Sequence, residues 1–210
     1  MNPMILLASV FIIFIPALML PGPDFIAVVR SSMTRGAAAG IWTTLGISLG
    51  LGFYATVSLV GLSAILVEYQ WLAWLVRILG GSYLVYLGFR LLTVNPVKIG
   101  NAGKTGKSSG HPLLFGFLVT LTNPKAVVLF TSVFATAVTE TTPFWLMALM
   151  IGLVMLSSLI WYSIVSLFMS SPTILIRFRN AQHWIERAAG VCFIGIGGRI
   201  LADARNPVAP

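Results

Sequence analysis

The sequence contains few charged residues. Only 9% are Asp, Glu, Lys or Arg, and 5 of the 210 residues are acidic, whereas a soluble domain carries about 25% charged residues. So few charges cannot cover the surface of a 22.6 kDa globule in which apolar stretches of about 20 residues recur. This scarcity excludes a water-soluble protein, and the mean hydropathy of +0.96 indicates an all-α integral membrane protein.

Cysteine and histidine are also scarce. The single Cys192 excludes an internal disulfide, a paired-cysteine redox relay and a multi-thiolate metal site. The two histidines, His111 and His183, lie in basic stretches with no second ligand nearby, so we expect no metal site and no cofactor. An intramembrane enzyme would need clustered acids, histidines or a nucleophile with its base. We find no such cluster and expect a protein that is not an enzyme.

The apolar residues form six segments. A helix needs about 20 apolar residues to cross a bilayer. The last segment, 188–198, is uncharged over only 11 residues, so the sequence is compatible with five or six spans. We favour six, with an amphipathic interfacial helix over 174–187 leading into the last span. Six spans leave room for one polytopic membrane domain, residues 1–210, with a long polar loop at 95–111. The other five apolar segments are 4–29, 36–67, 71–92, 113–138 and 144–169.

The basic residues predict the orientation of these spans. Two of them, Arg199 and Arg205, follow the last span. Because Lys and Arg concentrate on the cytoplasmic side, loops one-two, three-four and five-six are predicted to be cytoplasmic and both termini to lie outside. The net charge of +8 therefore suggests no nucleic-acid partner. Two three-helix halves would then have inverted orientations. Nine basic residues lie in loops one-two, three-four and five-six: Arg30, Arg35, Arg90, Lys98, Lys104, Lys107, Arg177, Arg179 and Arg187.

The first span is interrupted by Pro21, Gly22, Pro23 and Asp24. Two prolines remove two backbone N–H donors, and glycine relaxes the backbone, so the helix must break or kink. Freed polar groups survive in a membrane only when they are buried in protein or line water. We interpret the break as a half-helix start that can hold a substrate carboxylate. The alternative is a plain proline kink with Asp24 near the interface.

The fourth span is interrupted by Asn123, Pro124 and Lys125. Asn123 can cap a half-helix that begins with Pro124, and Lys125 lies too deep in its span to reach the interface easily. The predicted partner of Lys125 is Asp24, in an ion pair or near pair that could exchange protons during transport. Helices 1 and 4 are therefore both predicted to be broken.

A ladder of four glycines follows the first break: Gly36, Gly40, Gly46 and Gly50 form two G-x-x-x-G pairs. At 100° per residue they share one helix face, which predicts close helix packing.

These motifs, in this order, resemble the lysine and homoserine exporter (LysE/RhtB-type) family of bacteria. The residues that carry the resemblance are the Pro21–Asp24 break, the glycine ladder, the run Tyr83 to Gly88, and the Asn123–Lys125 break followed by Ala126. The resemblance covers nearly the whole chain.

The resemblance implies an efflux carrier for amino acids or their derivatives in the bacterial cytoplasmic membrane, driven by the proton-motive force. Protons and an amino acid would be its partners, within the lipid bilayer. The implied functional core is Pro21, Gly22, Pro23, Asn123, Pro124 and Lys125, to which we add Asp24 on physical grounds. The substrate stays open, as does the choice between a monomer and a homodimer. The rival hypothesis is a non-transporting helical membrane subunit.

Overall fold

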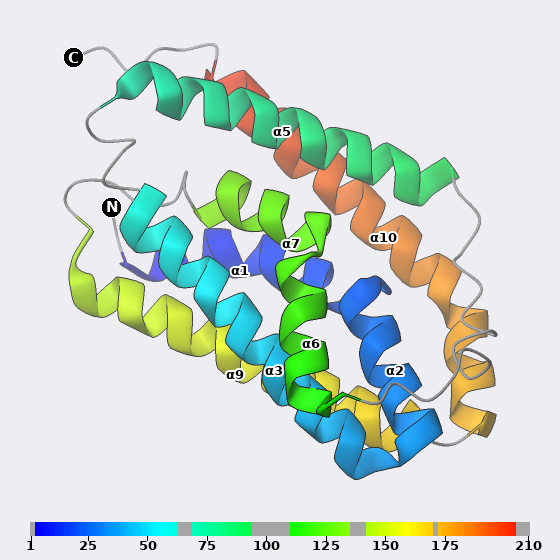
Figure 1. Ribbon diagram of the computed structural model, residues 1–210. Helices are drawn as coiled ribbons and strands as arrows, with labels where there is room; N and C mark the ends of the chain where they lie inside the picture. Colours follow the sequence, from blue (N-terminus) through cyan, green and yellow to red (C-terminus); the bar gives the residue numbers. More distant parts are fainter. Residues whose placement is uncertain (1–2, 63–68, 94–109, 135–141, 170–171, 205–210) are drawn as a thin grey trace.

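The computed structural model describes residues 3–62, 69–93, 110–134, 142–169 and 172–204, and every regular element in these ranges is helical. The predicted polar loop therefore lies largely outside the described residues, together with Arg205. Figure 1 shows the helices as a bundle of long rods around the shorter α2, α6 and α7. The elements are α1 (Pro3–Met19), α2 (Pro23–Arg35), α3 (Ala37–Thr56), η1 (Val57–Leu62), α5 (Gln70–Thr93), α6 (Pro112–Leu121), α7 (Pro124–Leu129), η3 (Phe130–Phe134), α9 (Phe144–Met169) and α10 (Pro172–Ala204).

Helices end and restart at both proline-containing positions. Between α1 and α2 the axis bends by 45°, because Pro21 and Pro23 cannot donate backbone hydrogen bonds to the preceding turn. Between α6 and α7 the helix is interrupted at Thr122 and Asn123. In both cases a proline occupies the first turn of the new helix, where its missing N–H removes no intrahelical bond.

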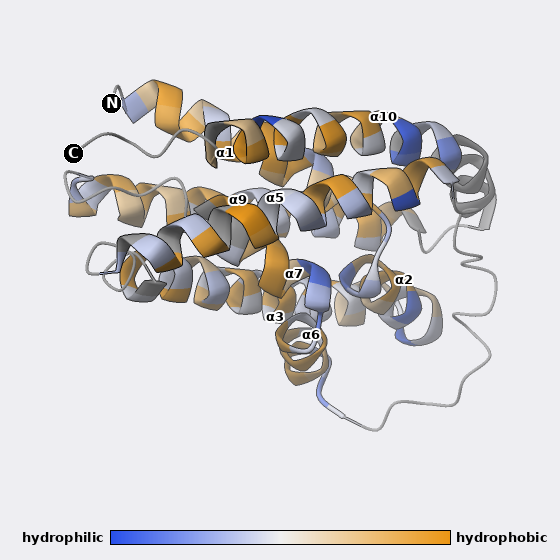
Figure 2. Ribbon diagram, turned by 90° about the horizontal axis from the view of Figure 1, so that it is seen from above, coloured by the Kyte–Doolittle hydropathy of each residue, from blue (hydrophilic) through white to orange (hydrophobic). Residues whose placement is uncertain are grey.

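Two helices in the described part of the chain are long and apolar enough to cross a membrane, namely 37–61 and 144–168. A third span results if the bent pair α1 and α2 is counted as one. Figure 2 shows hydrophobic residues along most helix surfaces. The exposed side chains of these helices include Trp42, Phe53 and Leu167, as expected for surfaces that face lipid.

Helix α3 packs against α2, α6 and α9, and its glycines permit the close approach. A Cβ atom at Gly46 would overlap the backbone of Leu113 on α6, and one at Gly50 would press on Thr120. A Cβ at Gly40 would overlap the hydroxyls of two serines, one on α2 and one on α9.

Gly36 does not have the packing role that the glycine ladder predicts for it. It has no atom within 4 Å of its Cβ position, and it joins α2 to α3 with φ at 85°. Residues with a side chain rarely adopt this positive φ. Gly36 therefore serves the turn, which its spacing in the ladder does not reveal.

Helices α5 and α10 lie side by side as a separate layer (Figure 1). Their glycines meet in reciprocal pairs, Gly81 with Gly197 and Gly88 with Gly190, so that each backbone approaches the other closely. The interfacial helix and the short last span that the sequence predicts lie within one continuous 33-residue helix, α10. Its charged first half and apolar second half differ in hydropathy, but nothing in the sequence between them breaks a helix.

Candidate functional site

The carboxylate of Asp24 lies at the meeting point of the two helix breaks. Asp24 is in the first turn of α2, and only 6% of its surface is exposed. A charged group buried to this degree requires polar partners, because its transfer out of water is costly.

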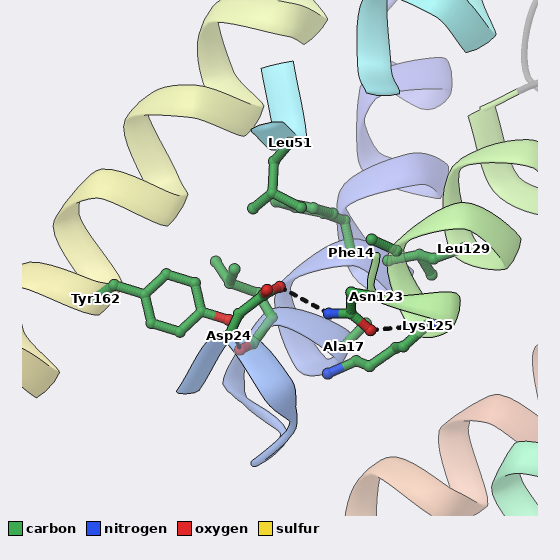
Figure 3. Close-up of a pocket in the computed structure, with 10 residues that line it drawn as sticks. Phe14, Ala17, Asp24, Leu51, Asn123, Lys125, Leu129 and Tyr162 are labelled. Atoms are coloured by element: carbon green, nitrogen blue, oxygen red, sulfur yellow. Dashed lines mark hydrogen bonds between the residues drawn. The ribbon is translucent and has the colours of Figure 1, made fainter. Parts of the chain in front are cut away.

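Both oxygens of Asp24 accept hydrogen bonds from the fourth predicted span. Thr120 Oγ1 on α6 donates to Oδ1 at 3.0 Å, and Asn123 Nδ2 donates to Oδ2 at 2.9 Å. Thr120 and Asn123 are themselves buried. Both side chains reach Asp24, although the break between α6 and α7 separates them. Figure 3 shows Asn123 between Asp24 and Lys125.

Asn123 also begins α7. Its Oδ1 accepts a hydrogen bond from the backbone N–H of Lys125 at 3.0 Å, and its backbone oxygen accepts from Ala126 and Val127. One residue therefore caps α7 and holds the carboxylate of Asp24 at the same time. The amide orientation follows from these two bonds, since its oxygen faces an N–H donor and its nitrogen faces a carboxylate.

The ammonium of Lys125 lies beside the first break. Its Nζ donates to the backbone oxygen of Leu20 at 3.2 Å, and a Cβ at Gly22 would lie 3.7 Å from this nitrogen. In the described part of the chain no direct ion pair joins Lys125 to Asp24. Asn123 links them instead, and both side chains line the same small pocket.

This pocket lies between α1, α2, α3, α7 and α9. Its volume of about 20 Å³ holds roughly one water molecule, which is too little for an amino acid. Tyr162 of α9 is buried in its wall, with its hydroxyl 3.5 Å from the backbone oxygen of Leu18. The pocket is lined by Phe14, Ala17, Leu18, Asp24, Leu51, Asn123, Lys125, Ala126, Leu129 and Tyr162.

Phe14 in the pocket wall belongs to a cluster of aromatic side chains that extends to η3. The rings of Phe14 and Phe130 are 5.9 Å apart, and those of Tyr54 and Phe130 are stacked at 6.1 Å. Tyr54 donates its hydroxyl to the backbone oxygen of Leu121 at 2.7 Å, next to the second break. On this side the wall of the pocket thus continues into stacked and tilted aromatic rings.

The structure brings Gly22, Asp24, Asn123 and Lys125 together. Pro21, Pro23 and Pro124 shape the two breaks, and none of the three lines the pocket. Sequence reasoning missed Thr120 as a partner of Asp24, because no spacing rule connects it to Asn123 across the break between α6 and α7. It also did not single out Tyr162, which lines the pocket.

A buried acid and a half-buried base at two helix breaks, in an apolar helical chain, are features of membrane transporters. The chain belongs to the family described as LysE type translocator, which matches residues 15–204.

Among its relatives are the threonine efflux proteins of Salmonella typhimurium and Escherichia coli K12. Each is 31% identical to this chain, over 92% of this chain and 96% of the relative. The leucine efflux protein of Salmonella choleraesuis is 28% identical over 66% of this chain and 63% of its own length. No solved structure matches the chain.

Proposed function

We propose that the protein exports an amino acid or a close derivative across the bacterial cytoplasmic membrane. The observation that carries this proposal is the buried Asp24 carboxylate, held by Thr120 and Asn123 beside the Lys125 ammonium. One acid and one base in one pocket complement the ammonium and carboxylate of a zwitterion. The efflux proteins related to this chain support the same conclusion.

In this proposal, the substrate ammonium binds Asp24, and its carboxylate binds Lys125 and the first turn of α2. The 20 Å³ pocket corresponds to a closed state, so the helices around it must separate to admit the substrate. Proton coupling completes the proposal, with Asp24 or Lys125 exchanging a proton as the substrate leaves.

The proposed architecture is one domain of six spans, over residues 1–210, in two inverted halves. Helices α1 and α2 correspond to α6 and α7, α3 corresponds to α9, and α5 to α10. Two contacts support this pairing. Helices α3 and α9 run antiparallel, since Gly40 meets Ser166 and Gly52 meets Met155, and α5 and α10 meet through reciprocal glycine pairs. A reporter fused to the C-terminus should read as periplasmic, whereas a cytoplasmic readout would contradict the six-span arrangement.

The efflux of labelled amino acids from preloaded cells tests the function. Cells that express the chain should release labelled L-threonine or L-leucine faster than control cells, and an uncoupler that collapses the proton gradient should abolish the difference. An Asp24→Asn variant present in the membrane at the same level should behave like the control. If a full panel of amino acids shows no release, the chain is better explained as a non-transporting membrane subunit.

A further inference from the structure

Buried hydroxyl groups line the contact between α2, α3 and α9. We define the hydroxyl seam as Ser31 and Ser32 on α2, Thr43 and Thr44 on α3, and Ser166 on α9. All five are buried, and none of them lines the pocket at Asp24. The seam occupies the end of the bundle where α2 ends and α3 begins.

The seam is held together by hydroxyl–hydroxyl contacts between helices. Ser32 Oγ donates to Ser166 Oγ at 3.0 Å, and Thr43 Oγ1 lies 2.8 Å from Ser31 Oγ. Ser166 Oγ in turn donates to the backbone oxygen of Ala37 at 2.9 Å. Gly40 makes this closure possible, since a Cβ there would overlap both Ser32 and Ser166.

One hydroxyl of the seam has no partner. Thr44 Oγ1 is buried without a hydrogen bond, which is an unfavourable arrangement in an apolar protein interior. The antiparallel register places Thr44 between the Gly40–Ser166 contact and the Ser48–Ser158 hydrogen bond of 2.9 Å. At that level α9 carries Tyr162, which lines the pocket.

The seam leads from the pocket to the basic end of α2. Asp24 and Ser31 are seven residues apart on α2, about two helical turns, so they lie on the same side of the helix. Arg30 and Arg35 lie in the second half of α2, and Figure 2 shows hydrophilic residues at this end of α2. By the distribution of basic residues, this is the cytoplasmic end.

We propose that the hydroxyl seam is the closed cytoplasmic access path to Asp24, and that Thr44 is a polar contact for the zwitterion or its water on that path. This inference rests on the proposed function. Hydroxyl groups both donate and accept hydrogen bonds, so each contact across the seam can be exchanged for one to water, an ammonium or a carboxylate. On the side of Phe14, Tyr54 and Phe130 the contacts are between aromatic rings, and the Tyr54 hydroxyl is bonded to a backbone oxygen, that of Leu121.

Cysteine labelling from the cytoplasmic side tests the path without requiring transport. With Cys192 replaced by serine, Thr44→Cys and Ser166→Cys are treated with a membrane-impermeant maleimide in inside-out vesicles. Val165→Cys is the matched control, because Val165 adjoins Ser166 on α9 and is equally buried. We expect the two seam cysteines to react at least 10-fold faster than the control, and faster than they do in right-side-out vesicles. Equal reactivity, or faster reaction from the outside, overturns the proposed path.

Thr44→Val tests the role of the hydroxyl itself. If Thr44 only fills space, removing an unpartnered buried hydroxyl leaves efflux unchanged. If Thr44 contacts the substrate, efflux of labelled L-threonine should fall about 3- to 10-fold, the range that corresponds to one hydrogen bond, while thermal stability stays the same or rises. If the Thr44→Val variant exports at the wild-type rate, the proposed contact between Thr44 and the substrate is wrong. If the wild-type chain exports no amino acid, the proposed function is wrong, and so is the substrate contact at Thr44. The cysteine labelling then decides by itself whether the seam is an access path.

Discussion

The side chain of Asn123 donates a hydrogen bond of 2.9 Å from Nδ2 to the carboxylate of Asp24, and its Oδ1 accepts one from the backbone N–H of Lys125. The amide thus connects the acid of the first helix break to the start of the half-helix after the second. A change at either break must therefore affect the other.

Asn123→Ala should remove both of these interactions. Loss of an N-cap costs about 0.5–2 kcal/mol, and the buried Asp24 carboxylate loses one of its two donors. We expect lower thermal stability of the purified protein and at least a 10-fold loss of efflux. Thr122→Ala is the control, because the neighbouring Thr122 is exposed and bonds only to its own helix. If both variants behave alike, Asn123 does not join the two breaks.

Asp24→Asn should separate function from stability. Asparagine has nearly the same shape and keeps one oxygen for Thr120 or Asn123, and burying a neutral amide costs less than burying a carboxylate. We therefore expect thermal stability that is unchanged or higher, with efflux reduced to background because the substrate ammonium loses its counter-charge. Efflux at the wild-type rate, and with the same dependence on pH, would remove Asp24 from the proposed mechanism.

The two helix breaks could be predicted because they have a local cause. Proline lacks an N–H wherever it occurs, and an asparagine before Pro124 is an N-cap signal. The sequence also isolated Asp24 and Lys125, because charges inside apolar spans are rare. These predictions needed no knowledge of how the helices pack.

The partners of Asp24 depend on packing, which the sequence does not encode locally. Thr120 reaches Asp24 because α6 packs beside α2. The position of α6 depends in turn on Gly46 and Gly116, which allow α3 and α6 to approach each other closely. The packing of α10 depends on contacts of the same kind. Hydropathy separates its charged and apolar halves, whereas its glycine contacts with α5 hold the apolar half in place as part of the bundle.

Gly46→Ala should destabilise the protein. The new methyl group would overlap the backbone of Leu113, which cannot move as a side chain can, and such overpacking typically costs about 1–3 kcal/mol. Gly152→Ala is the control, because Gly152 lies within α9 and has no atom within 4 Å of its Cβ position. There we expect unchanged stability or a gain of up to about 1 kcal/mol from helix propensity. The apparent melting temperature in detergent compares the two, and equal shifts would mean that α3 and α6 do not pack this closely.

Lys125→Met should test the charge opposite Asp24. Methionine retains an unbranched apolar stem but cannot donate to the backbone oxygen of Leu20, which Lys125 Nζ reaches at 3.2 Å. Loss of that bond alone costs about 1–3 kcal/mol of stability.

Lys125→Arg separates this structural effect from the charge, because arginine keeps the charge and the donors in a larger group. In a pocket of about 20 Å³ we expect arginine to restore only part of the efflux that methionine abolishes. The rate of labelled amino-acid release, corrected for protein in the membrane, gives the comparison. Efflux by Lys125→Met at the wild-type rate would show that the substrate carboxylate does not depend on this ammonium.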